Sequence, residues 1–181
     1  MHDPSSPDLV ALALRGDAEA IGSLYDMHYQ AIFRYFQVRV GEQELAEDLT
    51  GDVFKRMLTG LPQYRPMGLP FRAWLFRIAH NLLVDHYRRE SGHRSAALCE
   101  TERQGGSDAD PASVVEQRLT MEQACRALSE LDPPQRDVLA LRFLSGLSLR
   151  EVALALNRTE DSVKALQRRG LAALRLTLIP E

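Results

Sequence analysis

Basic side chains recur at helical spacing near the C-terminus, where Lys164, Arg168 and Arg175 follow one another within "SVKALQRRGLAALR". At about 100° per residue these three fall on one side of a helix, whereas Val163 and Leu166 fall on another. Lys and Arg side chains bind phosphate groups and the edges of DNA bases. The spacing therefore indicates a helix that buries an apolar stripe and offers a cationic stripe to a polyanion.

The residues before this helix predict a second helix and a sharp turn. Ser148, with Glu151 three residues later, has the sequence pattern of a capping box. Asn157 tolerates the left-handed conformation that ends a helix, and Thr159 is a good N-cap for the basic helix. A plain solvated helix would carry the same charges without these signals. Together they are typical of a helix-turn-helix, whose second helix enters the DNA major groove.

Helical periodicity extends through the rest of the chain, and no run of residues is convincing as a strand. Apolar residues at three- and four-residue spacing predict helices over 9–14, 18–36, 42–58 and 71–89, with Asp17 as the N-cap of the second. In the helix-turn-helix block, Asp132 is expected to cap a helix that runs to about Leu144, with Gln135 reaching back to the cap amide. We therefore expect an all-α fold.

Residues 91–117 differ in composition from both flanks, because Ser, Gly, Asp and Glu crowd together and aromatic residues are absent. Such a composition is typical of a flexible linker. We expect two helical modules, residues 9–90 and 118–176, joined by this acidic tether. The net charge of −3 conceals a gradient, since residues 1–60 carry five Lys or Arg against ten Asp or Glu and residues 139–181 carry seven against four. An acidic total therefore does not exclude nucleic acid as a partner.

The helix expected over 71–89 has two apolar faces. One consists of Phe71, Trp74, Leu75, Ile78 and Leu82, and the other, almost opposite, consists of Phe76, His80, Leu83 and Tyr87. Such a helix must be covered on both sides, by helices of its own bundle or by a partner. Its start, with Tyr64, Arg65, Arg72 and Arg77 at hand, could also hold unstacked bases by stacking and charge.

Enzyme chemistry finds little support in the sequence. No phosphate-cradling glycine loop, His-Glu-x-x-His motif or nucleophile elbow occurs, and His80 and His86 are about 240° apart on one helix. The two cysteines, Cys99 and Cys125, indicate neither a disulfide framework nor a thiolate zinc site. We expect no catalytic residue, metal or cofactor. With no secretory signal and no apolar run of about 20 residues, we expect a cytoplasmic protein without a membrane segment.

From about Leu9 to Leu176 the chain resembles the sigma-70 family of bacterial transcription initiation factors, in the extracytoplasmic-function (ECF) group that has only regions two and four. Three segments carry the resemblance, and they occur in the expected order with a linker between them. They are "ELAEDLTGDVFKRML" (44–58), "FRAWLFRIAHNLLVDHYRR" (71–89) and "LDPPQRDVLALRFLSGLSLREVALALNRTEDSVKALQRRGLAALR" (131–175).

The resemblance implies a non-catalytic subunit that binds core RNA polymerase, through the largest-subunit coiled coil and the flap, and promoter DNA. The polymerase-docking residues would be Asp48, Asp52, Phe54 and Arg56. The loop 64–70 and the next helix would capture flipped bases of the minus-10 element through Tyr64, Arg65, Arg72, Trp74, Arg77 and Asn81. The last helix would read the minus-35 element through Thr159, Lys164, Ala165, Arg168 and Arg169. An anti-sigma factor is a possible further partner, for which the second apolar face of 71–89 is suited.

Two other functions compete with this reading. A free-standing helix-turn-helix regulator would bind duplex DNA as a dimer, but it would need neither the acidic docking helix nor the two-faced helix 71–89. A purely structural helical adapter would leave the basic reading helix unexplained. Addition of core RNA polymerase separates the first alternative from an initiation factor, because only the latter confers specific transcription.

Overall fold

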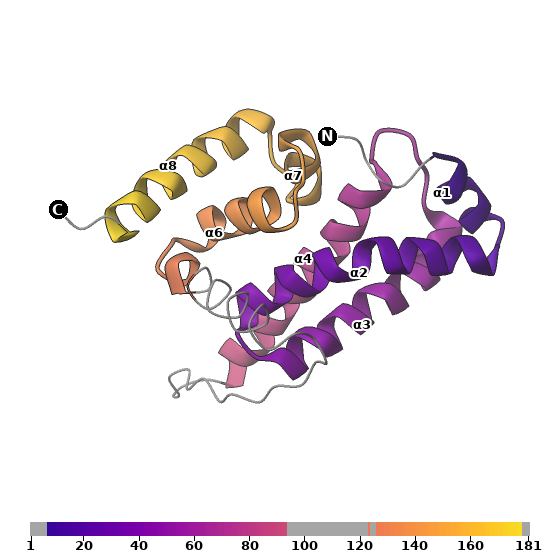
Figure 1. Ribbon diagram of the computed structural model, residues 1–181, viewed down its shortest axis with the longest axis horizontal. Coiled ribbons are helices and arrows are strands. Elements are labelled where there is room, and N and C mark those ends of the chain that lie inside the picture. The colour runs from indigo at the N-terminus through magenta and orange to yellow at the C-terminus, as the bar shows by residue number, and fades with distance from the viewer. Residues whose placement is uncertain (1–6, 94–122, 124–125, 179–181) are drawn as a thin grey trace, which may run out of the picture.

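The computed structural model describes residues 7–93, 123 and 126–178. In this part of the chain all regular structure is helical, which confirms the expected all-α fold (Figure 1). Residues 94–117 of the expected linker, together with Cys99 and Cys125, lie outside the described residues. Below, the first module means α1 to α4, and the second module means α6, η2, α7 and α8.

The first module consists of α1 (Pro7–Leu14), α2 (Ala18–Val40), α3 (Gln43–Gly60), the short η1 (Leu61–Gln63) and α4 (Phe71–His93). The Asp17 carboxylate accepts a hydrogen bond from the Ala20 amide at 2.8 Å and so caps α2, as the sequence predicts. Gly41 ends α2 with φ 76°, a left-handed conformation that suits glycine. These two ends allow α2 and α3 to run side by side (Figure 1).

The second module consists of α6 (Pro133–Leu139), the π-helical η2 (Ala140–Leu144), α7 (Leu149–Ala155) and α8 (Glu160–Leu178). Asp132 is the N-cap residue of α6, as predicted, but its side chain accepts no hydrogen bond from the helix amides. Pro134 has no N–H to donate, and the Gln135 amide bonds instead to the Asp132 carbonyl at 2.9 Å. The Gln135 side chain lies 3.3 Å from the Asp132 carboxylate rather than at the cap amide.

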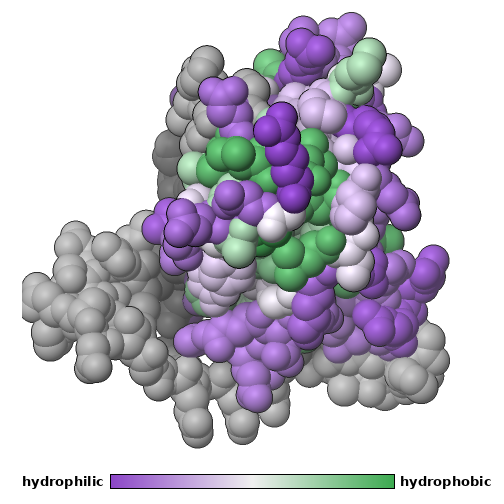
Figure 2. All heavy atoms as spheres, turned by 90° about the vertical axis from the view of Figure 1, so that its right-hand side faces the viewer, coloured by the Kyte–Doolittle hydropathy of each residue, from purple (hydrophilic) through white to green (hydrophobic). Residues whose placement is uncertain are grey.

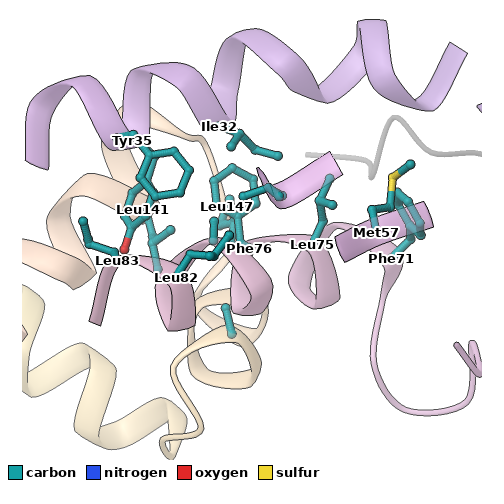
Figure 3. Close-up of a cluster of buried hydrophobic side chains, with 14 of the residues drawn as sticks. Ile32, Tyr35, Met57, Phe71, Leu75, Phe76, Leu82, Leu83, Leu141 and Leu147 are labelled. Carbon is teal, nitrogen blue, oxygen red and sulfur yellow. The ribbon is translucent and has the colours of Figure 1, made fainter. Parts of the chain in front are cut away.

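Helix α4 of the first module lies at the junction with the second module. One side of α4 packs on α2 and α3, and the other packs on α7 of the second module. Figure 3 shows Phe76, Leu82 and Leu83 of α4 near Tyr35 of α2 and Leu141 of η2. The prediction that α4 must be covered on both faces is therefore confirmed, and the second cover is the chain's own C-terminal module. The larger of two apolar core clusters thus runs through both modules.

One end of the molecule combines polar and apolar surface. Figure 2 looks at the end where α1, the start of α2 and the end of α3 meet, and it shows apolar residues gathered inside a rim of hydrophilic ones. None of the helices in the described part of the chain is both long and apolar enough to span a membrane.

Candidate nucleic-acid interface

The helix-turn-helix is formed by α7 and α8, and three local signals set its geometry. The capping box is complete: the Glu151 amide donates to Ser148 Oγ at 3.2 Å, and the Ser148 amide donates to Glu151 Oε2 at 2.7 Å. Asn157 has φ 52°, the left-handed conformation expected at the turn. Thr159 caps α8, since its hydroxyl accepts from the Ser162 amide at 3.2 Å. These contacts confirm the local structure that the sequence predicts.

Helix α8 divides into a buried and an exposed face. Val163, Leu166 and Gly170 are buried, whereas Lys164, Arg168 and Arg169 are exposed. Within α8, Lys164 Nζ has an acidic neighbour 3.3 Å away, Asp161 Oδ1, in an exposed contact that contributes little to stability. The exposed face therefore offers cationic groups to an anionic partner without breaking any buried interaction. Ala165 is half-buried and lies between Arg168 and Arg169 around the helix, where its small side chain leaves room for close approach.

Three aromatic residues meet where α4 begins. The ring centroids of Tyr64 and Trp74 are 4.8 Å apart, and those of Phe71 and Trp74 are 5.6 Å apart. Tyr64 is buried, and its hydroxyl donates to the Leu69 carbonyl at 2.7 Å, which anchors the 64–70 loop. Trp74 is half-buried. In this conformation Trp74 offers aromatic surface to solvent, whereas a base could reach Tyr64 only after movement of the loop.

The other residues expected to capture bases have different surroundings. Asn81 and Arg65 are exposed, and Arg65 Nη1 donates to the Pro62 and Tyr64 carbonyls at 3.0 Å. Arg72 and Arg77 are half-buried and donate across the molecule to carbonyls of the second module, those of Ser145 and Leu154 respectively. The structure therefore brings Tyr64, Trp74 and the 64–70 loop together. Arg72 and Arg77, in contrast, form hydrogen bonds with the second module.

The residues expected to dock on polymerase share α3 but not a single environment. Asp48 and Arg56 are exposed, and Asp52 is half-buried with its Oδ1 3.0 Å from Lys55 Nζ. Phe54 is buried, with its ring centroid 4.4 Å from that of Tyr25. The Phe54 ring therefore packs α3 against α2 and does not lie on the surface. An open depression of about 580 Å³ lies between α3 and the end of α4, and its lining consists of Leu45, Asp48, Leu49, Asp52, His86, Arg89 and Glu90.

A polar cluster between the modules has no counterpart in the sequence-based predictions. Arg39 at the end of α2 lies with its Nη2 3.0 Å from Oδ1 of Asp137 in α6, and both side chains are largely buried. His80 Nδ1 lies 4.0 Å from the other Asp137 oxygen and 3.3 Å from the Tyr35 hydroxyl. Arg39 and Asp137 are 98 positions apart in the sequence, and no sequence pattern indicates that they pair. Only the fold reveals this contact.

Burial shifts the pKa values of this cluster. Desolvation lowers the pKa of His80, and the nearby Asp137 carboxylate opposes that shift only in part. Desolvation also raises the pKa of Tyr35, which is fully enclosed, and that of Tyr87. His80 is therefore neutral near pH 7, and the charges of the cluster are those of Arg39, Asp137 and the adjacent Arg136. In the described residues no group of three or more His, Cys, Asp or Glu side chains is arranged to hold a metal ion.

Each of the two modules is similar to a known protein family. Residues 24–93 match the family model of sigma-70 region 2, and residues 127–176 match that of sigma-70 region 4. The ECF RNA polymerase sigma factor BldN of Streptomyces coelicolor is 34% identical over 96% of this chain and 66% of its own length. The ECF sigma factor SigD of Mycobacterium tuberculosis is 30% identical over 92% of this chain and 81% of its own length.

A solved structure extends the likeness to the arrangement of the whole chain. CnrH in complex with the cytosolic domain of CnrY has a TM-score of 0.71 and 28% identity, over 96% of this chain and 97% of CnrH. Region 2 corresponds to the first module and region 4 to the second. The polar caps, the basic helix α8 and the aromatic start of α4 thus occur in a chain that belongs to the ECF group of RNA polymerase sigma factors.

Proposed function

We propose that the chain assigns three tasks of a sigma factor to three surfaces. The exposed face of α8 reads the minus-35 element, the start of α4 receives unstacked bases of the minus-10 element, and α3 docks on the coiled coil of the largest polymerase subunit. The flap of the polymerase is the partner of region 4. The chain acts as a non-enzymatic initiation factor in the cytoplasm and needs no cofactor.

The geometry of the helix-turn-helix carries this proposal. The capping box at Ser148 fixes the start of α7, and the left-handed Asn157 forms the turn that leads into α8. Lys164, Arg168 and Arg169 are exposed on α8 because its other side packs inward. A basic second helix presented in this way is suited to the major groove, where Arg forms bidentate hydrogen bonds with guanine. Thr159 and Ala165 lie beside these residues and permit close approach to the DNA.

The minus-10 surface is proposed on the aromatic start of α4. Trp74, half-buried beside Phe71, provides a surface for stacking, and Asn81 and Arg65 provide exposed polar groups. Unstacking a base costs a few kcal/mol, which aromatic stacking of about 1–3 kcal/mol per base offsets. Permanganate reactivity of promoter thymines tests this surface: Asn81→Ala and Tyr64→Ala should each reduce strand opening. Unchanged melting in both variants would remove both residues from the proposal.

An anti-sigma factor is a further proposed partner. The support is the similarity to CnrH, whose structure was solved with the cytosolic domain of CnrY. In this chain the apolar second face of α4 is already covered, by Tyr35 and Arg39 of α2 and by region 4. We therefore place such a partner on the outside of the closed chain, where the exposed ends of α3 and α4 flank the open depression.

Run-off transcription tests the proposed function as a whole. Purified chain and core RNA polymerase are incubated with a library of linear promoters, and the transcripts are sequenced. A defined set of start sites that appears only when the chain is present supports the proposal. Binding of duplex DNA without any effect on transcription by the core enzyme supports instead a free-standing helix-turn-helix regulator.

A further inference from the structure

Arg142 lies in η2, and its guanidinium group joins two other segments of the second module. Its Nε donates to Oε1 of Gln167 in α8 at 3.2 Å, and its Nη1 donates to the Leu147 carbonyl. Leu147 comes directly before Ser148, the N-cap of α7. One side chain therefore connects the start of the first helix of the helix-turn-helix with the middle of the second.

The backbone around Arg142 is fixed by the core. The turn of η2 is π-helical, with the Ser145 amide bonded to the Ala140 carbonyl at 3.0 Å. The Leu147 amide then bonds to the Leu141 carbonyl at 3.0 Å, and both of these leucines are fully buried. Arg142 itself is half-buried, which strengthens its hydrogen bonds relative to those of a fully solvated side chain. Arg142 is thus a firm attachment point for α8.

Gln167 lies on α8 between the buried stripe and the cationic stripe. At about 100° per residue it is about 40° around the helix from Val163 and about 60° from Lys164. Val163 is buried and Lys164 is exposed. The packed face otherwise consists of apolar contacts, such as the close approach of Gly170 to α6. Because apolar contacts are non-directional and hydrogen bonds are directional, the bond at Gln167 resists rotation of α8 about its own axis.

We propose that Arg142 is a positioning residue, which fixes the rotation of α8 through Gln167 so that the exposed cations meet base edges. The inference rests on the proposed function, since it concerns how α8 reads the minus-35 element. Base readout requires side chains within about 0.5 Å and 10–20° of the productive geometry. Attraction to phosphates, in contrast, tolerates many orientations of a basic helix. Loss of the Arg142–Gln167 bond should therefore lower sequence discrimination more than total affinity for DNA.

The substitution Gln167→Leu tests this directly, because it removes the acceptor and leaves the charge of Arg142 in place. The holoenzyme formed with core RNA polymerase is titrated with a promoter selected by run-off transcription, and with the same promoter after its minus-35 element is scrambled. We expect the ratio of the two affinities to fall by about 10-fold, the effect of losing one charge-assisted hydrogen bond. Affinity for the scrambled promoter should stay the same. An unchanged ratio, or an equal loss on both promoters, would overturn the proposal.

Three further variants separate positioning from direct contact with DNA. Gln167→Glu keeps an acceptor for Arg142 and should retain the ratio, although its negative charge weakens binding to both promoters. Arg142→Met should lower the ratio at least as far as Gln167→Leu, and the double variant should match Arg142→Met, because the two side chains act through one bond. Additive losses would assign Arg142 a contact of its own with DNA and contradict the proposal. Arg88→Met is the matched control, since it removes an exposed cation of α4 and should leave the ratio unchanged.

Heteronuclear NMR spectroscopy of the free chain detects the bond without DNA or polymerase. The Arg142 Nε–H signal should exchange slowly with water in the unmodified chain and rapidly in Gln167→Leu, while thermal denaturation confirms that each variant folds. Rapid exchange in the unmodified chain would contradict the proposal. If the unmodified holoenzyme does not discriminate between the two promoters, the proposed reading role of α8 and this proposal are both wrong. If it discriminates and the variants equal it, only this proposal is wrong.

Discussion

Replacing Gly170 with alanine tests how closely α8 packs on α6. A Cβ atom at Gly170 would lie 2.9 Å from Leu139 Cδ1 and 3.3 Å from Gln135 Cβ. Carbon atoms normally meet at about 3.5–4.0 Å, so either Leu139 or the helix axis has to move. Leu139 is itself buried, which leaves its side chain little space for a different rotamer.

Two opposing effects set the size of the change. Alanine is favoured over glycine in a helix interior by about 0.8–1.0 kcal/mol, whereas overpacking a core costs about 1–3 kcal/mol. Gly170→Ala should therefore range from neutral to about 2 kcal/mol destabilising. Gly22 in α2 is the matched control, because it is exposed and its Cβ would have no neighbour within 4 Å. Gly22→Ala should stabilise the chain by about 1 kcal/mol.

Urea and thermal denaturation of both variants measure the difference. A chain of this size shifts its melting temperature by about 2–4 °C per kcal/mol, so Gly22→Ala should melt a few degrees above the unmodified chain and Gly170→Ala at or below it. If Gly170→Ala is as stable as Gly22→Ala, then α6 and α8 do not pack as closely as described. In that case α6 would not hold α8 in one position.

Three further predictions concern the polar cluster, the cap and the reading helix. Burial lowers the pKa of His80 below its ordinary 6.5, so the unfolded chain takes up the proton first and stability falls as the pH drops from 6.5 through the lowered pKa. Urea denaturation at about pH 7.5 and about pH 5.5 should show a larger loss for the unmodified chain than for His80→Gln; equal losses contradict the burial. Ser148→Ala removes the acceptor of the Glu151 amide and should cost about 1 kcal/mol. The exposed Ser129→Ala is its control and should change the urea midpoint little. Arg168→Ala should weaken minus-35 binding by about 1–3 kcal/mol and relax sequence preference, whereas Lys164→Ala, if it contacts phosphate, should weaken all sequences alike in fluorescence anisotropy titrations.

Local structure could be predicted from the sequence because its causes lie within a few residues. The capping box at Ser148, the turn at Asn157 and the cap at Asp17 each depend on contacts over three or four positions. At Asp132 the helix start was predicted but the side-chain cap was not formed, and Pro134 removes one of the amides that such a cap would bind. The π-helical segment 140–144 was not predicted, because the spacing of apolar residues does not distinguish a π-helical turn from an α-helical one.

Long-range contacts could not be predicted in the same way. The two apolar faces of 71–89 required two covers, but periodicity does not identify which segment supplies them. Region 4 supplies one of them, and this placement explains why Arg72 and Arg77 donate to carbonyls 73 and 77 positions away. The residues proposed to contact DNA and polymerase stay predictions, because their roles depend on partners and not on the fold of the free chain.

The double use of α4 limits how this protein can change in evolution. Arg72 and Arg77 are proposed to meet DNA, and they also join α4 to the Ser145 and Leu154 carbonyls. A substitution that changes promoter preference at either position would also remove hydrogen bonds that join region 2 to region 4. Selection for a new target sequence and selection for a well-packed fold would thus act on the same side chains. Substitutions that change promoter preference are less constrained on α8, because its exposed cations do not contact region 2 in the described residues.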